Sequence, residues 1–388
     1  MVAPDTLRPR SRFGSLPLRY PEFRALWLAT TLAGTAYIGE TVVLGWWLLE
    51  RTDSPFIVSL GVALRALPNF LFGIPGGALA DRVDRRLLLR LAGAALAVDA
   101  GLLGLLALTG QLAVWQLLPL TFVSGGLRSL AQTARQAYAF DIVGPGEVVG
   151  GMAFMSLGQR AGSIGGAFGA GLILGTWGAG EAYLAVGACH LLSVIAIMLA
   201  KVKGRAAPVG RPPVWAGVQE FVTEVGRNRN LALLVLLTAT AEVLGFSHQA
   251  VLPSLARDRL HAGAAGLGLL NGFAAVGGLI SVFLLTFRGE LRSKGFVYLV
   301  VVLLFGIAVA LLGIGNSLAP ALIGIMFVGS LASLTDLLAQ GLLQSVVAND
   351  LRGRAMGSWV LATGLGPVGH LQIGALASLL GEIGRAHV

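Results

Sequence analysis

Two charged residues stand inside long apolar stretches at positions that could form an ion pair. Glu40 lies within residues 24–49 and Arg65 within residues 55–79. A charge inside a bilayer costs roughly 2.5–3.5 kcal/mol on insertion scales, so it marks a functional site by default. Both residues are equally far from Thr52-Asp53, so antiparallel helices would place them at one depth. The spacing predicts a buried pair that could recognise a cation or bind and release a proton. The alternative is an Arg65 that extends to the membrane surface and an unrelated Glu40.

Other charged residues inside apolar stretches are further candidates for a cavity that binds substrate or couples its movement to an ion. They are Asp99, Arg128, Arg160, Glu242 and Asp336. For Arg160 the alternative is contact with lipid headgroups. Three single histidines on different stretches, His190, His248 and His370, show no metal-ligand spacing and are typical of hydrogen-bonded packing residues rather than proton relays.

The composition shows which elements must position these residues. Of 388 residues, 55% are hydrophobic and 12% are charged, and the mean hydropathy is +0.80. A soluble domain carries about 25% charged residues, so a soluble enzyme and a disordered chain are excluded. The single cysteine, Cys189, cannot form an internal disulfide, which excludes a secreted disulfide scaffold.

A bilayer core of about 30 Å needs about 20 mainly apolar residues in a helix to cross it. Eleven stretches meet this length, and their continuous apolar runs exclude a transmembrane β-barrel, whose residues alternate. We therefore expect an all-α integral membrane protein. The predicted spans are 24–49, 55–79, 87–110, 113–137, 151–174, 182–200, 230–254, 264–287, 295–315, 319–343 and 355–380.

The basic residues between the spans predict the orientation in the membrane. With a cytoplasmic N-terminus, almost all of them fall in cytoplasmic segments, and Arg135 is counted there at the end of the fourth span. The opposite breaks hold only Arg51, Arg257 and Arg259. The net charge of +9 is therefore a topology signal, assisted by contact with anionic lipid, and no nucleic-acid partner is expected.

A polar stretch and an internal repeat divide the spans into two halves. We expect an N-terminal bundle of six helices over 1–200, a cytoplasmic linker with an amphipathic helix over 201–229, and a C-terminal bundle over 230–388. Residues 125–130 match 329–334, and further matches follow at the same shift of 204 residues. Parallel repeats of this kind are typical of secondary transporters. Within the repeat, Glu242 falls a few residues from the counterpart of Glu40.

The second half contains five spans where the first contains six. Residues 382–388, Glu-Ile-Gly-Arg-Ala-His-Val, resemble a translated sequencing adapter. The sequence therefore predicts that a twelfth helix of the natural protein is truncated and that residues 381–388 do not pack on the bundle. The alternative is a natural polar tail on an eleven-helix protein.

The break after the second span contains the most specific motif, Gly77-Ala-Leu-Ala-Asp81-Arg82-Val-Asp84-Arg85-Arg86. It resembles the signature Gly-x-Leu-Ala-Asp-Arg-x-Gly-Arg-Arg of the major facilitator superfamily, with Asp84 where glycine is usual. The sequence of this motif is similar to that of the drug-efflux and siderophore-export branch, which includes enterobactin exporters and macrolide efflux proteins. The resemblance implies that Gly77, Asp81, Arg82, Arg85 and Arg86 form a cytoplasmic gating motif. The alternative is a positively charged loop with incidental acidic residues.

The resemblance also implies the fold and the activity. Two six-helix bundles would rock about a central cavity in the plasma (inner) membrane of a monomeric protein. They would export a small amphipathic molecule in exchange for protons. The sequence contains neither the P-loop pattern Gly-x-x-x-x-Gly-Lys-[Ser/Thr] nor a catalytic or metal-ligand spacing, so we expect no ATP-driven step, no enzyme activity, no cofactor and no metal. The alternatives are an importer or facilitator of a small nutrient on the same fold, and a membrane enzyme or scramblase.

The fifth span is rich in glycine, at 158, 162, 165, 166, 169 and 171. Its Gly162-Ser-Ile-Gly-Gly166 resembles the antiporter signature Gly-Pro-x-x-Gly-Gly but lacks the proline and is one residue short. Small residues spaced in this way also permit close packing of helices. Both interpretations stay open at this point, and the packing interpretation is favoured.

Overall fold

The computed structural model describes residues 17–144, 147–202, 223, 225–288, 293–346 and 363–386, without the side chains of 73–82, 149, 286–288, 344–346 and 381–386. Every regular element in these ranges is helical, which confirms the predicted all-α class. The first group of elements is η1 (Pro17–Arg19), α1 (Pro21–Thr52), α2 (Pro55–Arg82), α3 (Arg85–Leu108), α4 (Val114–Val143), α5 (Val148–Thr176) and α6 (Ala179–Leu199). The second is α8 (Arg229–Thr240), η2 (Ala241–Gly245), η3 (Phe246–Val251), α9 (Leu252–Ser254), η4 (Leu255–Arg259), α10 (Gly263–Arg288), α11 (Lys294–Ile314), α12 (Leu318–Val346) and α14 (Gly366–Ala386).

The predicted spans coincide with helices in the described ranges, but three differ in detail. The seventh span, predicted as one helix, changes from α-helix to π-helix at Ala241 and to a 3₁₀-helix at Phe246. The fourth continues to Val143, six residues beyond its predicted end. The last span is described from residue 363 onward, and α14 continues to Ala386, so residues 381–386 are helical. The prediction that residues 381–388 do not pack on the bundle concerns side chains outside the description.

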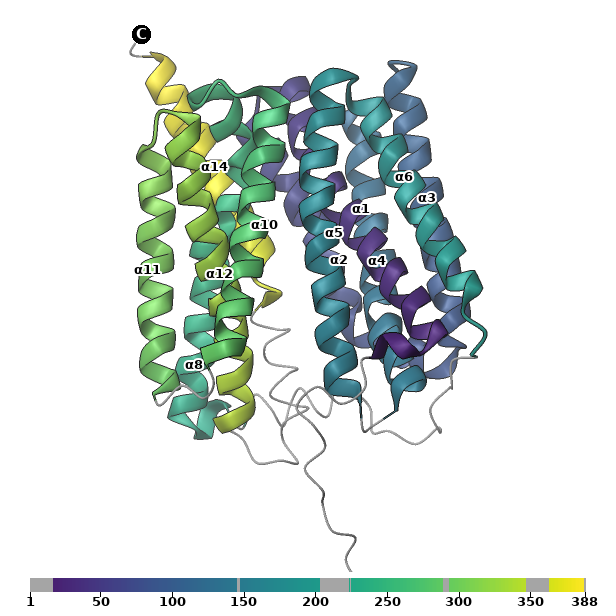
Figure 1. Ribbon diagram of the computed structural model, residues 1–388. Coiled ribbons are helices and arrows are strands. Elements are labelled where there is room, and N and C mark those ends of the chain that lie inside the picture. Colours follow the sequence, from purple (N-terminus) through teal and green to yellow (C-terminus); the bar gives the residue numbers. More distant parts are fainter. Residues whose placement is uncertain are drawn as a thin grey trace, which may run out of the picture.

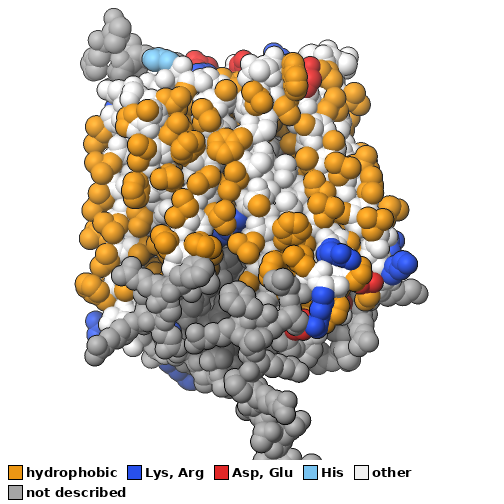
Figure 2. Space-filling model, viewed as in Figure 1, with side chains coloured by type: hydrophobic (Ala, Val, Ile, Leu, Met, Phe, Trp, Pro, Cys, Tyr) orange, Lys and Arg blue, Asp and Glu red, His pale blue; other side chains and the backbone are white. Residues whose placement is uncertain are grey.

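The outer surface of the helices is suited to lipid. Eight described helical segments are long and apolar enough to cross a membrane. Large apolar side chains such as Leu91 and Val98 on α3 and Leu303 on α11 are exposed. Figure 2 shows hydrophobic side chains along the flank of the molecule, with many of the visible charged groups toward its two ends. The protein is therefore an integral membrane protein.

Local chemistry fixes the ends of the helices that carry the candidate residues. Proline occupies the first turn of α1, where its missing N–H costs no helical hydrogen bond. α1 ends at Asp53, whose backbone is left-handed (φ 51°), and the chain reverses into α2. Asp84 caps α3, and its carboxylate accepts hydrogen bonds from the backbone N–H groups of Arg86 and Leu87 at 2.8 and 3.4 Å. This cap gives a physical reason for aspartate where the superfamily pattern has glycine.

The helices form two groups that lie side by side (Figure 1). In one group α1 packs on α5 and α6, α3 on α6, and α2 on α4; in the other, α10 and α11 pack on α12. Helices α2 and α5 of the first group contact α14 and α10 of the second. We name the two ends of this assembly by residues: the Asp53 end, where α1 turns into α2, and the Arg85 end, where α2 meets α3.

The two groups touch closely near the Asp53 end. A Cβ atom added at Gly171 of α5 would lie 2.5 Å from the Cα of Gly268 in α10, and one added at Gly45 of α1 would lie 2.8 Å from Pro253. Arg257 of η4 also donates hydrogen bonds to the Asp53 carboxylate and, at 3.1 Å, to the carbonyl oxygen of Leu49. These contacts join the groups at this end.

We expect Arg257→Gln to loosen the Asp53 end. Because the Arg257–Asp53 ion pair is partly exposed, the expected effect is modest, about a two- to fivefold faster labelling of a cysteine at Ser59 by an impermeant maleimide in a Cys189→Ser background. Ser59 is fully buried in the structure. The control is Arg51→Gln, because Arg51 lies over the Trp47 ring of its own helix. Equal labelling of the two variants would show that Arg257 does not hold this end closed.

Several predicted features fall on residues outside the description. Gly77, Asp81 and Arg82 belong to α2, but their side chains are not described. Most of the linker over 201–229, including its predicted amphipathic helix, is outside the described ranges as well. Arg85 and Arg86 are described: Arg85 pairs with Asp141 of α4 at 2.7 Å, and Arg86 donates to the carbonyl oxygen of Met198. These two contacts tie α3 to its own group of helices.

Candidate functional site

The ion pair between Glu40 and Arg65 is the centre of a buried polar cluster. Arg65 Nη2 lies 3.3 Å from Glu40 Oε2, and both side chains are less than a tenth exposed. The pairing and depth agree with the prediction from their spacing. Ser124 of α4 donates a hydrogen bond to Glu40 Oε1 at 2.9 Å. The carboxylate is therefore held by groups from α2 and α4, at the seam where these helices meet α1.

Arg65 has further partners on α1. It donates hydrogen bonds to the carbonyl oxygen of Tyr37, at 2.6 Å, and to the hydroxyl of Thr41. Its guanidinium carbon lies 4.4 Å from the centre of the Tyr37 ring. The guanidinium carbon of Arg128, from α4, lies 4.0 Å from the same centre. Tyr37 thus connects the ion pair to a second arginine through cation–π contacts.

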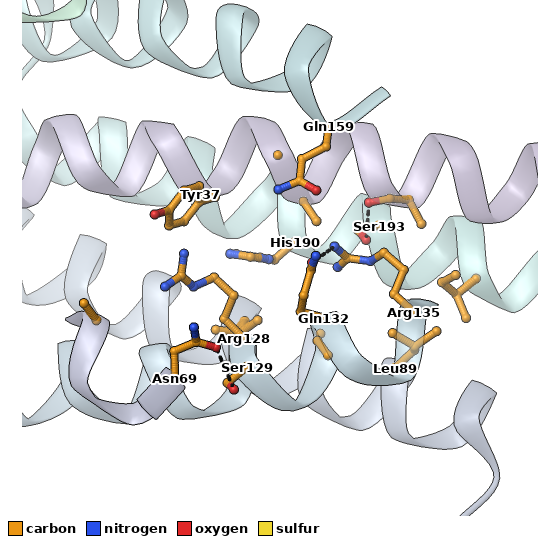
Figure 3. Close-up of a pocket in the computed structure, with 18 of the residues that line it drawn as sticks. Tyr37, Asn69, Leu89, Arg128, Ser129, Gln132, Arg135, Gln159, His190 and Ser193 are labelled. Carbon is orange, nitrogen blue, oxygen red and sulfur yellow. Dashed lines mark hydrogen bonds between the residues drawn. The ribbon is translucent and has the colours of Figure 1, made fainter. Parts of the chain in front are cut away.

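That second arginine lines a cavity of about 490 Å³. Among the described residues, helices α1 to α6 and α12 contribute to the wall. Figure 3 shows ten of the lining residues labelled, with polar groups from α1, α2, α4, α5 and α6. The lining residues are Ala29, Ala33, Gly34, Tyr37, Ala66, Asn69, Phe70, Leu89, Gly93, Leu96, Arg128, Ser129, Ala131, Gln132, Arg135, Gln159, His190, Ser193, Ile197, Asp336, Thr363 and Gly364. Leu89 and Gly93 belong to the first turns of α3, so the cavity lies toward the Arg85 end. Its volume is in the range of pockets for drug-sized molecules, about 300–1,000 Å³.

Helix α4 supplies a row of polar side chains to this wall. Arg128, Gln132 and Arg135 are spaced at i, i+4 and i+7, so they share one face of the helix. Arg135 Nη1 donates to Gln132 Oε1 at 3.3 Å. On the neighbouring α2, Asn69 Oδ1 accepts a hydrogen bond from Ser129 at 3.1 Å. This wall of the cavity is rich in hydrogen-bond donors, and two of its residues carry a positive charge.

In the part of the wall that the structure describes, the second group of helices adds one carboxylate. Asp336 of α12 lies in the wall, and Arg160 of α5 donates to Ser333, one turn before Asp336, at 3.1 Å. Arg160 therefore bridges the two groups of helices. Glu242 lies in the π-helical turn of the seventh span and close to Gly366 rather than in the cavity wall. π-helical turns occur often at functional sites.

The cavity includes some of the predicted residues and omits others. Arg128, Asp336 and His190 line it. Asp99 is buried on α3, outside the wall, and His248 and His370 lie on the second group of helices. His248 Nδ1 lies 2.7 Å from the carbonyl oxygen of Gly245, in agreement with a packing role.

Arg135 corrects the interpretation of the basic residues. Its assignment to a cytoplasmic break is wrong, because α4 continues to Val143 and Arg135 lines the cavity. The buried Arg85–Asp141 pair holds this extension of α4 against α3. The spacing of Arg128, Gln132 and Arg135 was a signal in the sequence that could have identified this face. Tyr37 and Gln159 had no comparable signal.

Comparisons with known proteins agree with this architecture. Residues 13–383 match the MFS_3 family, described as transmembrane secretion effector. The enterobactin exporter EntS of Shigella boydii serotype 4 is 25% identical over 380 residues, which cover 96% of this chain and 89% of the exporter. EntS of Citrobacter koseri is also 25% identical, over 389 residues with the same shares covered.

Solved structures share the fold at low sequence identity. The nucleoside transporter NupG superposes with a TM-score of 0.73 at 10% identity, covering 92% of this chain and 91% of its own. A bacterial homologue of the lysosomal transporter Spinster, in an inward-facing conformation, gives 0.73 at 19% identity over 96% of this chain and 86% of its own. A peptide transporter, POT, gives 0.73 at 14% identity over 97% and 91%.

Proposed function

Because the chain belongs to the transmembrane secretion effector family of the major facilitator superfamily, we propose that it exports small amphipathic molecules of the drug or siderophore type. Export proceeds by alternating access, and protons that enter the cell drive it. The similarity to enterobactin exporters over 96% of the chain is the observation that carries this proposal. The drug-sized cavity, with apolar and hydrogen-bonding walls, supports it.

The proposal includes a location and an orientation. The protein lies in the plasma (inner) membrane as a monomer in contact with lipid, with its N-terminus and its Arg85 end in the cytoplasm. Residues 1–200 and 230–388 form the two moving bundles, and residues 201–229 link them on the cytoplasmic side. In this orientation the contacts at the Asp53 end join the two groups on the outer side, and the cavity, toward the Arg85 end, lies nearer the cytoplasm. This is the state from which an exporter loads its substrate.

An importer or facilitator of a small nutrient is the alternative. The nucleoside and peptide transporters with the same fold favour it. Everted membrane vesicles distinguish the two functions, and the substrates tested are antibiotics, dyes and siderophores. We expect accumulation of at least one of them when the lumen is acidified, and its loss with a protonophore. Accumulation in right-side-out vesicles alone would favour import. Vesicles without the protein are the control.

We propose that the gating motif stabilises the outward-facing state of the protein. The motif is formed by Gly77, Asp81, Arg82, Arg85 and Arg86. Asp81→Asn is expected to reduce transport about tenfold or more while membrane insertion is retained, because the uncharged amide binds a helix N-terminus or an arginine less strongly. Labelling of cysteines in the outer half of the cavity measures the state directly and should fall. Unchanged labelling in an inactive variant would reject the conformational role.

A further inference from the structure

Two arginines of α4 face the cavity, and neither is paired with an acid among the lining residues that the structure describes. Arg128 and Arg135 are two helical turns apart, a rise of about 10 Å. Both line the cavity, and Figure 3 shows their side chains on the same side of α4, with Gln132 between them.

The two arginines that are buried in the part of the chain that the structure describes are paired with acids. Arg65 has Glu40 at 3.3 Å, and Arg85 has Asp141 at 2.7 Å. Among the residues that the structure describes, no carboxylate lies within ion-pair distance of Arg128 or Arg135. Both arginines are half-buried and line the cavity, so their charges are available to an anion that enters it.

The present contacts of these arginines include no ion pair, and Glu40, which is near enough to Arg128 to interact with it electrostatically, is paired with Arg65. Arg128 lies over the Tyr37 ring, and Arg135 donates to the neutral amide of Gln132. The one carboxylate in the described wall, Asp336, comes from α12, and Arg160 lies near enough to interact with it electrostatically. The α4 wall is therefore electropositive.

We propose that the cavity binds an amphipathic anion, with its carboxylate or similar oxyanion between Arg128 and Arg135. Guanidinium groups suit this partner because their N–H groups form two parallel hydrogen bonds to an oxyanion. The apolar part of the anion lies against Phe70 of α2 and Leu96 of α3, which also line the cavity. The inference deepens the proposed export function, on which it rests, by assigning the charge of the substrate.

The test measures binding by the full chain, purified and placed in nanodiscs of zwitterionic phosphatidylcholine. The probes are dansylglycine, an anion, and dansylglycinamide, its neutral counterpart. We expect the protein without substitutions to bind dansylglycine about tenfold more tightly than dansylglycinamide. Arg128→Gln and Arg135→Gln should each lower this ratio by threefold or more, and together they should bring it close to one. Arg128→Lys should retain part of the preference, because it keeps the charge.

The matched control is Arg19→Gln, which removes an arginine at the surface that pairs with Glu147, and it should leave the ratio unchanged. Equal binding of the two probes to the natural protein would overturn the proposal, whatever the variants do. A ratio that persists in the Arg128→Gln/Arg135→Gln variant would overturn it too. If anionic phosphatidylglycerol in the nanodiscs displaces dansylglycine from the natural protein, the occupant is a lipid headgroup and the assignment to substrate fails.

This binding experiment needs no ion gradient and no transport. An arginine-dependent ratio without export in vesicles would leave the anion site standing and reject the exporter. Export without any preference for dansylglycine would support the exporter and reject the anion site.

Discussion

Glu40→Gln and Arg65→Gln should each lower the amount of folded protein more than the double variant does. Removal of one partner leaves a buried group without compensation, at a cost of about 3–5 kcal/mol, whereas removal of both is often close to neutral. The pair is suited to this test because both side chains are buried and Arg65 Nη2 lies 3.3 Å from Glu40 Oε2. The readouts are the monodisperse fraction after detergent extraction and the unfolding temperature.

We also expect Glu40→Gln to be the more harmful single change. It leaves Arg65, whose guanidinium cannot lose its proton, beside the Tyr37 carbonyl and the Thr41 hydroxyl. Arg65→Gln leaves a carboxylate that can take up a proton and keep its bond from Ser124. Glu147→Gln is the control, because its pair with Arg19 lies at the surface and its loss should have little effect. Additive losses in the double variant would show that the two residues act independently.

The same variants test whether Glu40 couples transport to protons. We propose that Glu40 changes its pairing with Arg65 during the transport cycle. The double variant gives the cleanest test because it is expected to fold. Proton-driven transport in vesicles should lose its dependence on the pH gradient when Glu40 is absent. If the double variant keeps the dependence on the pH gradient, Glu40 has a structural role and the coupling residue lies elsewhere. Asp99, Glu242 and Asp336 are then the candidate carboxylates predicted inside the spans.

The membrane helices and the central ion pair were predictable because a lipid bilayer permits few backbone structures. A chain in a bilayer must satisfy its backbone hydrogen bonds internally, so long apolar runs become helices. Adjacent antiparallel helices then keep residues that are equally far from the turn at equal depth. This geometry brings Glu40 and Arg65 together without any knowledge of the other helices.

The cavity was not predictable in the same way, because it depends on how distant helices cross. Gln159 and His190 meet α4 only through the packing of α5 and α6. Arg135, at the end of the fourth predicted span, was counted with the cytoplasmic residues because hydropathy locates the edge of a span and not the end of a helix. The interruption of the seventh helix at Ala241 also leaves no trace in an apolar run, since hydropathy is independent of the hydrogen-bond pattern.

The glycines of α5 had two interpretations in the sequence, and the structure separates them by helix face. A Cβ atom added at Gly162 would lie 2.0 Å from the carbonyl oxygen of Thr31, and one at Gly166 would lie 2.1 Å from that of Thr35. A Cβ at Gly165 or Gly169 would meet nothing within 4 Å. Residues 162 and 166 are one turn apart and let α1 approach α5 closely. The spacing therefore favours close packing for these two glycines.

Gly162→Ala and Gly166→Ala are each expected to destabilise the protein by at least about 3 kcal/mol, at the upper end of the range for overpacking, because two backbones must separate. Loss of the monodisperse fraction and a lower unfolding temperature would measure this. Gly165→Ala and Gly169→Ala are matched controls on the same helix. They should leave stability unchanged or raise it, since alanine favours a helix by about 1 kcal/mol over glycine.

The control variants also decide the second interpretation of the glycine-rich segment. If Gly162→Ala and Gly165→Ala are equally stable, the packing of α1 against α5 does not require glycine at position 162. If Gly165→Ala folds normally but loses proton-driven transport, the segment has a role in antiport that packing does not explain. Normal folding and normal transport in Gly165→Ala, with loss of folded protein in Gly162→Ala, would support close packing on α1 as the role of Gly162.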